Sequence, residues 1–147
     1  MEINDLLVPE GVVADLKATS KKQALQDLAK RAAEVSGLHE RAIFDVLMER
    51  ERLGTTGVGN GIAIPHGTPE SRDAVLETGV RILQFPEGVT WHDGARVHVL
   101  VAIAAQSDEH LDILRHLTRV LDKPGLAEKL GHATDAAELV ALLSKAP

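Results

Sequence analysis

The sequence has no cysteine, very few aromatic residues and no long apolar run. Among its 147 residues cysteine is absent, and aromatic residues make up 2%. The missing cysteine excludes disulfides and fits a reducing compartment. So few aromatic rings also make a surface for stacking nucleic-acid bases improbable. The longest apolar run, residues 99–105, is far shorter than the roughly 20 residues that a membrane-spanning helix needs.

Positive charge is also scarce. The chain carries 16 Lys and Arg against 22 Asp and Glu, a net charge of -6, which argues against nucleic acid or an anionic membrane surface as the main partner. The first residues include Glu2, Asp5 and Glu10 and do not resemble a signal peptide. We therefore expect a soluble, cytoplasmic protein without direct membrane insertion, folded as one domain over residues 1–147.

Hydrophobic periodicity and capping residues predict an α/β single-domain sandwich with a mixed central β-sheet flanked by helices. Ser20 and Gln23 have the spacing of a capping box, and Gly37 is a helix stop. The strand at 97–105 is apolar on both faces, which predicts a central position in the sheet. The full expectation is helices at 20–37, 40–53 and 107–121, short helices starting at Pro124 and Asp135, strands at 62–64, 78–85 and 97–105, and an edge strand within 6–13.

Seven histidines make metal binding the first function to test. His92 and His98 are six positions apart, as are His110 and His116, and neither spacing matches a zinc motif. On the predicted helix, His110 and His116 lie on different faces and cannot share an ion. We expect no metal and no cofactor, and we interpret His92 and His98, like His39 and His132, as structural or solvated.

Arg50 lies on the apolar stripe of its predicted helix, beside Ile43 and Leu47. A guanidinium stays charged and is costly to bury alone. Two interpretations remain open: Arg50 extends to the helix end or an ion pair, or it binds an anion.

Two histidines are candidates for chemistry. His110 falls on the inward stripe of its helix and in the first turn, where the helix dipole lowers the imidazole pKa and favours a neutral ring. His66 follows a strand and Pro65 and precedes Gly67, which predicts a place at the sheet edge, where α/β folds keep their sites. For His110 a satisfied core histidine is the alternative, and for His66 a turn histidine. The glycines before His66 fit no dinucleotide-binding pattern.

The segments RERLGTTGVGNGIAIPHG (50–67), QFPEGVTW (84–91) and IAAQSDEHLDIL (103–114) resemble the enzyme IIA component of the bacterial phosphoenolpyruvate-dependent sugar phosphotransferase system. The resemblance is to the mannitol/fructose class, closest to the mannitol type, and covers nearly the whole chain. It implies that His66 is the phosphorylated nucleophile, with His110 and Arg50 as the other catalytic residues. It also implies two partners: the histidine-containing phosphocarrier protein as donor and a IIB domain or protein of a sugar permease as acceptor.

The first segment is as close to the nitrogen-regulatory branch as to the mannitol type. A regulatory phosphoprotein that acts by binding other proteins is therefore the alternative, and a non-catalytic interaction domain is the third. For a partner surface around His66 the sequence suggests an apolar ring formed by Val58, Ile62, Leu111 and Leu114.

Overall fold

The computed structural model describes residues 12–18, 20–36, 40–54, 56–59, 61–65, 79–91, 95–104, 107–123 and 125–144. Within this part of the chain, no helix is both long enough and apolar enough to cross a membrane.

A five-stranded mixed sheet forms the centre of the molecule, in the order β1-β4-β5-β3-β2. The β1–β4 and β3–β5 pairs are parallel, whereas β4–β5 and β2–β3 are antiparallel. The central position predicted for the last strand is confirmed, since β5 lies between β4 and β3. The strands are β1 (Val12–Val13), β2 (Gly57–Gly59), β3 (Ile62–Ala63), β4 (Gly79–Thr90) and β5 (Arg96–Ala104).

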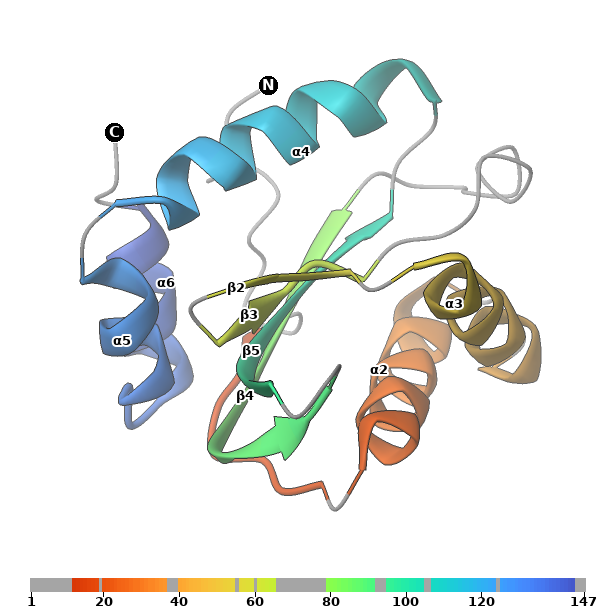
Figure 1. The fold of residues 1–147 in the computed structure, drawn as a ribbon, viewed down its shortest axis with the longest axis horizontal. Helices are drawn as coiled ribbons and strands as arrows, with labels where there is room; N and C mark the ends of the chain where they lie inside the picture. The colour runs from red at the N-terminus through yellow and green to blue at the C-terminus, as the bar shows by residue number, and fades with distance from the viewer. Residues whose placement is uncertain are drawn as a thin grey trace.

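Helices cover both faces of the sheet (Figure 1). One face packs against α4 (Ser107–Leu121), α5 (Leu126–Gly131) and α6 (Ala136–Ser144), and the other against α2 (Lys21–Ser36) and α3 (Glu40–Leu53). Successive strand residues point to opposite faces, so β4 and β5 contribute to both cores. The α4 core is aliphatic, whereas the α2–α3 core contains the aromatic side chains Phe44, Phe85 and Trp91. The α/β sandwich predicted from the sequence is confirmed.

Most helix ends follow local signals closely, but the short helix expected to start at Pro124 begins at Leu126 as α5, after Gly125 in a left-handed conformation. The bounds of α3 and α4 match the predicted ranges, and the Ser20 Oγ accepts a hydrogen bond from the Gln23 N–H at 3.1 Å at the start of α2. At the last helix, the Asp135 carboxylate accepts the Glu138 N–H at 2.8 Å. These caps bind backbone groups that the first helical turn leaves unpaired.

The strands depart further from prediction. We expected a strand to end at Phe85, but β4 continues to Thr90 because its register with β5 shifts between Gln84 and Val89. Such a bulge accommodates Pro86 within the strand. The strand β2 was not expected in the glycine-rich stretch, and β3 ends one residue before the predicted Ile64. Of the predicted edge strand, Val12 and Val13 form β1, and residues 6–11 lie outside the described ranges.

Gln84 joins β4 to the C-terminal end of α5. Its side chain is fully buried and donates from Nε2 to the carbonyl oxygens of Leu130 at 2.9 Å and Ala133 at 2.6 Å. Its Oε1 accepts the N–H of Asp15 at 2.9 Å, in the chain that leaves β1. One buried amide therefore holds three segments of the chain together.

Candidate functional site

The backbone is firmly held just before position 66. The N–H of Ile64 donates to the carbonyl oxygen of Thr56 at 3.0 Å, and the N–H of Ile103 donates to that of Pro65 at 3.0 Å. Both Ile64 and Pro65 are buried. These bonds place Pro65 at the end of β3, beside the end of β5. His66 itself lies outside the described residues, so its predicted position at the sheet edge is untested.

The second histidine belongs to the helix that follows β5. The strand ends at Ala104 and α4 begins at Ser107, so the chain that enters α4 leaves the sheet at the edge where Pro65 lies. His110 is in the first turn of α4, as predicted. Ile113 and Leu117, further along the helix, are buried against the sheet. The side chain of His110 lies outside the described part of the structure, so its inward orientation remains a prediction.

Arg50 extends to the end of its helix. Its Nη1 donates to the carbonyl oxygen of Gly54 at 2.8 Å, one residue beyond the last residue of α3. Leu47, on the same stripe, is buried, and Ile43 packs against the α2–α3 core. The first of the two interpretations therefore describes the contact that the structure shows. A cation at this place also interacts favourably with the C-terminal end of the helix dipole.

Sequence reasoning missed a polar cluster beside Arg50, which we call the Glu51 cluster: Lys21, Glu51, Thr56 and Trp91. Glu51 accepts a hydrogen bond from the Thr56 hydroxyl and lies 2.7 Å from the Lys21 ammonium. The Lys21 nitrogen also lies 4.9 Å from the centroid of the Trp91 ring. One signal was available: Glu51 follows the buried Leu47 by one helical turn, so it belongs beside the apolar stripe.

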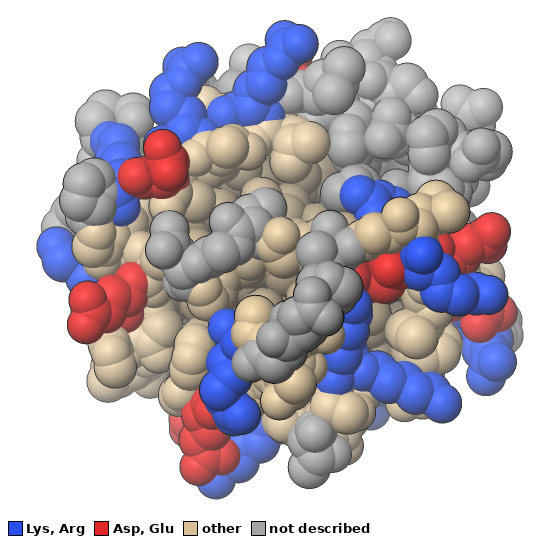
Figure 2. Space-filling model, viewed as in Figure 1, with Lys and Arg blue, Asp and Glu red and all other residues tan. Residues whose placement is uncertain are grey.

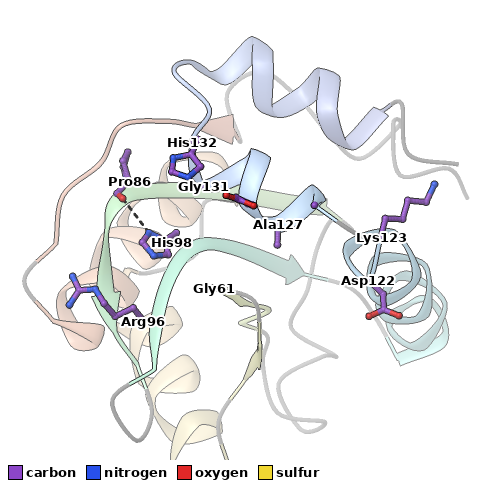
Figure 3. A pocket seen from close by; sticks show the side chains of 11 residues that line it. Gly61, Pro86, Arg96, His98, Asp122, Lys123, Ala127, Gly131 and His132 are labelled. Atoms are coloured by element: carbon purple, nitrogen blue, oxygen red, sulfur yellow. Dashed lines mark hydrogen bonds between the residues drawn. The ribbon is translucent and has the colours of Figure 1, made fainter.

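A different group of polar residues lines a cavity of about 550 Å³ at the opposite end of the sheet (Figure 3). There the Nδ1 of His98 lies 3.2 Å from the carbonyl oxygen of Pro86, and Figure 3 shows the ring directed towards that carbonyl. The structural interpretation of His98 agrees with this contact. Among the described residues, no group of His, Cys, Asp or Glu could hold a metal ion.

The apolar ring suggested for partner binding needs correction. Ile62 is 2% exposed and belongs to the α4 core, so it is not available to a partner. The reason is that β3 is an interior strand covered by α4. Leu114 packs partly against the same core, and the side chains of Val58 and Leu111 lie outside the described residues. A large apolar side chain that the sequence did not single out, Leu53, is 74% exposed near Arg50.

Charges of both signs share the face of the molecule seen in Figure 2. Lys and Arg side chains stand beside Asp and Glu side chains there. Among the described residues, Arg31 pairs with Asp27 and Arg41 with Asp45, each within one helix.

The chain is similar in sequence to known proteins over most of its length. The chain is 50% identical over 127 residues to a multiphosphoryl transfer protein of Escherichia coli, covering 86% of this chain but 34% of that protein. It is 40% identical over 150 residues to a nitrogen regulatory protein of Bradyrhizobium diazoefficiens, covering 100% of this chain and 97% of the relative. Thus the chain spans about a third of the length of one relative and nearly all of the other.

The fold matches solved structures as well. The complex of enzyme IIA-mannitol and phosphorylated enzyme IIB-mannitol from Escherichia coli contains a chain that aligns with a TM-score of 0.83 at 32% identity, covering 94% of this chain and 96% of that one. The sequence model of the EIIA 2 family of the phosphoenolpyruvate-dependent sugar phosphotransferase system matches residues 5–146. This chain therefore belongs to the EIIA 2 family of the phosphoenolpyruvate-dependent sugar phosphotransferase system.

Proposed function

We propose that the chain is a cytoplasmic phosphoryl carrier that accepts a phosphoryl group on His66 from the histidine-containing phosphocarrier protein and passes it to a IIB domain. The observation that supports this most directly is the hydrogen-bonded frame of Pro65. It is held by Ile103 at the sheet edge from which the chain enters α4, and His66 is the next residue. Residues 1–147 would then act as one IIA domain.

The chemistry requires a nucleophile that is also a good leaving group. In the first step the lone pair of a neutral His66 nitrogen forms a P–N bond while the P–N bond of the donor breaks. The donor imidazole leaves with the electron pair of that bond. In the second step a thiolate on IIB forms a P–S bond and the His66 imidazole leaves in the same way. Neutral imidazole suits both steps near pH 7.

Charge on the transferred group must be stabilised during each step. Arg50 would supply positive charge to the equatorial oxygens from the end of α3, and His110 would donate one hydrogen bond from the start of α4. The chain after α3 reaches Thr56, whose carbonyl binds the Ile64 N–H, and the chain before α4 includes Ile103, whose N–H binds the Pro65 carbonyl. No organic cofactor or metal enters this proposal.

The transported substrate would be mannitol or a related polyol, which the IIA-mannitol neighbour supports. A nitrogen-regulatory role is the second candidate, because the Bradyrhizobium relative aligns over nearly its whole length. Both functions use a phosphorylated His66. They differ in the partner: a IIB domain that accepts the phosphoryl group, or another protein that binds the phosphorylated chain. Phosphoryl transfer to a panel of IIB domains separates them: transfer to a mannitol-type IIB supports transport, and no transfer to any IIB supports regulation.

The central test is labelling from phosphoenolpyruvate with the two general proteins of the phosphotransferase system. We expect one acid-labile phosphoryl group per chain and none on His66→Ala. The matched control is His98→Ala, since His98 lies at the other end of the sheet and should label normally. Full labelling of His66→Ala would refute the assignment, and no labelling of a folded wild-type chain would favour a non-catalytic interaction domain.

A further inference from the structure

Glu51 is a buried carboxylate to which the proposed function assigns no role. Its side chain is 5% exposed, and its oxygens accept both the hydroxyl and the backbone N–H of Thr56, the latter at 3.3 Å. The Lys21 ammonium of α2 lies 2.7 Å away. A buried carboxylate is tolerated only with such partners, so its place in the fold is closely defined.

The contacts of Glu51 lead along the backbone to His66. Thr56, which Glu51 binds at two atoms, is 4% exposed, and its carbonyl oxygen accepts the N–H of Ile64 at 3.0 Å. Ile64 is two residues before His66. Thr56 therefore connects the Glu51 carboxylate, through hydrogen bonds, to the backbone two residues before the proposed nucleophile.

Glu51 and Arg50 hold the same turn from neighbouring helical positions. Arg50 binds the carbonyl oxygen of Gly54, at the start of the turn, and Glu51 binds Thr56, at its end. The geometry of this turn therefore couples the end of α3, where the guanidinium lies, to the strand that leads to position 66. A group that fixes this turn therefore fixes how the end of α3 lies relative to Ile64, two residues before the proposed nucleophile.

On this basis, and resting on the proposed function, we propose that Glu51 is a positioning residue for phosphoryl transfer: through Thr56 and Ile64 it aligns His66 with Arg50. Phosphoryl transfer depends mainly on alignment and charge stabilisation. A misplacement of about 1 Å can cost up to about a hundredfold in rate. A purely structural ion pair would instead affect the stability of the whole fold.

The test measures the single-turnover rate of phosphoryl transfer from the phosphorylated phosphocarrier protein to the full chain, at saturating and subsaturating donor. We expect Glu51→Ala to lower the saturated rate roughly ten- to a hundredfold, with half-saturation by the donor changed less than about twofold. Glu51→Gln retains an oxygen that accepts from Thr56 and should recover most of the rate. Equal rates for wild type and Glu51→Ala would overturn the proposal.

Two further variants distinguish a specific loss of transfer rate from a general loss of stability. Gln84→Met removes buried hydrogen bonds at the far end of the sheet and should lower the melting temperature at least as much as Glu51→Ala does, with a normal transfer rate. If Glu51→Ala does not fold, Thr56→Val replaces it, because this variant keeps the side-chain shape and the backbone N–H but loses the hydroxyl. A slower rate in Thr56→Val supports the proposal, and a wild-type rate in this variant contradicts it.

A second readout does not require any transfer. The imidazole C–H signals of His66, assigned by their absence in His66→Ala, are followed by NMR as pH is changed. Glu51→Ala should shift these signals or their titration midpoint, and Gln84→Met should not. If wild type is never phosphorylated but the signals respond in this way, the function is wrong and the positioning is right. Signals unchanged in Glu51→Ala would overturn the positioning, whether or not the chain is phosphorylated.

Discussion

The two ends of the sheet use polar side chains for different purposes. At one end, which we call the Pro65 end, Arg50 and Glu51 bind the turn that leads through Thr56 to Pro65. At the other, the bulge end, Gln84 and His98 contact backbone carbonyls of α5 and β4. The Pro65 end thus holds the segment that precedes the proposed nucleophile, whereas the bulge end uses its polar groups to join parts of the fold.

The comparison shows that a histidine near a cavity is not by itself a reactive site. His98 lies in a cavity with charged neighbours, yet its Nδ1 is directed to the Pro86 carbonyl. Its ring is half-buried and packs against two glycines, since a Cβ on Gly61 would lie 3.2 Å from its Cδ2 and one on Gly88 would lie 2.9 Å from its Cε1. His66, by contrast, follows a strand end held by two backbone hydrogen bonds.

The largest effect expected at the bulge end comes from Gln84→Met. The change removes the donor to Leu130 and Ala133 and the acceptor for Asp15, at similar side-chain volume. The loss of these hydrogen bonds should lower the free energy of unfolding by about 3 kcal/mol, measured by urea denaturation. The phosphoryl-transfer rate should stay at the wild-type value. A transfer rate that fell together with stability would show that the two ends are coupled, and would contradict the separation of their roles.

A smaller loss is expected for Gly88→Ala. Gly88 has a φ of 81°, and a Cβ there would lie 2.9 Å from both the His98 Cε1 and the Arg96 Nε. Backbone strain and crowding together should cost about 2 kcal/mol. Gly125→Ala is the matched control, because Gly125 has a φ of 79° with nothing within 4 Å of the added Cβ; it should show the strain alone, about 1 kcal/mol. Equal losses in the two variants, measured by urea denaturation, would show that His98 and Arg96 do not pack tightly against Gly88.

A change smaller than that of Gly88→Ala is expected for Arg50→Lys at the Pro65 end. The ammonium keeps the charge but loses the planar fork that pairs with phosphoryl oxygens. We expect donor binding to be retained and the transfer rate to fall about tenfold, equivalent to about 1.4 kcal/mol. The control is Arg52→Lys on the exposed side of the same helical turn, which should transfer normally. A wild-type rate in Arg50→Lys would exclude a specific role of the guanidinium.

Local patterns predicted the helices better than the strands. Ser20 caps α2 and Asp135 caps the last helix through bonds that span three residues, so the signal and its effect lie in the same short segment. The predicted end of β4 at Phe85 was wrong, because a proline ends a regular strand but is tolerated at a bulge. Whether a bulge forms depends on the partner strand, which a local pattern does not include. Arg50 was correctly placed on its stripe, and the Glu51 cluster was missed because Lys21 reaches it from a different helix.

By itself, the sequence determined the α/β class and the ends of α3 and α4, because periodicity and capping act within a few residues. The resemblance to a known family added His66, His110 and Arg50 as proposed site residues. Only the tertiary structure decided which buried polar groups meet. Gln84 bonds to Leu130, 46 positions away, and Glu51 pairs with Lys21 across two helices. Such pairs form only when the sheet and helices are packed, since neither partner can leave water without the other. The same packing explains why Ile62, which we expected on a partner surface, lies in the core.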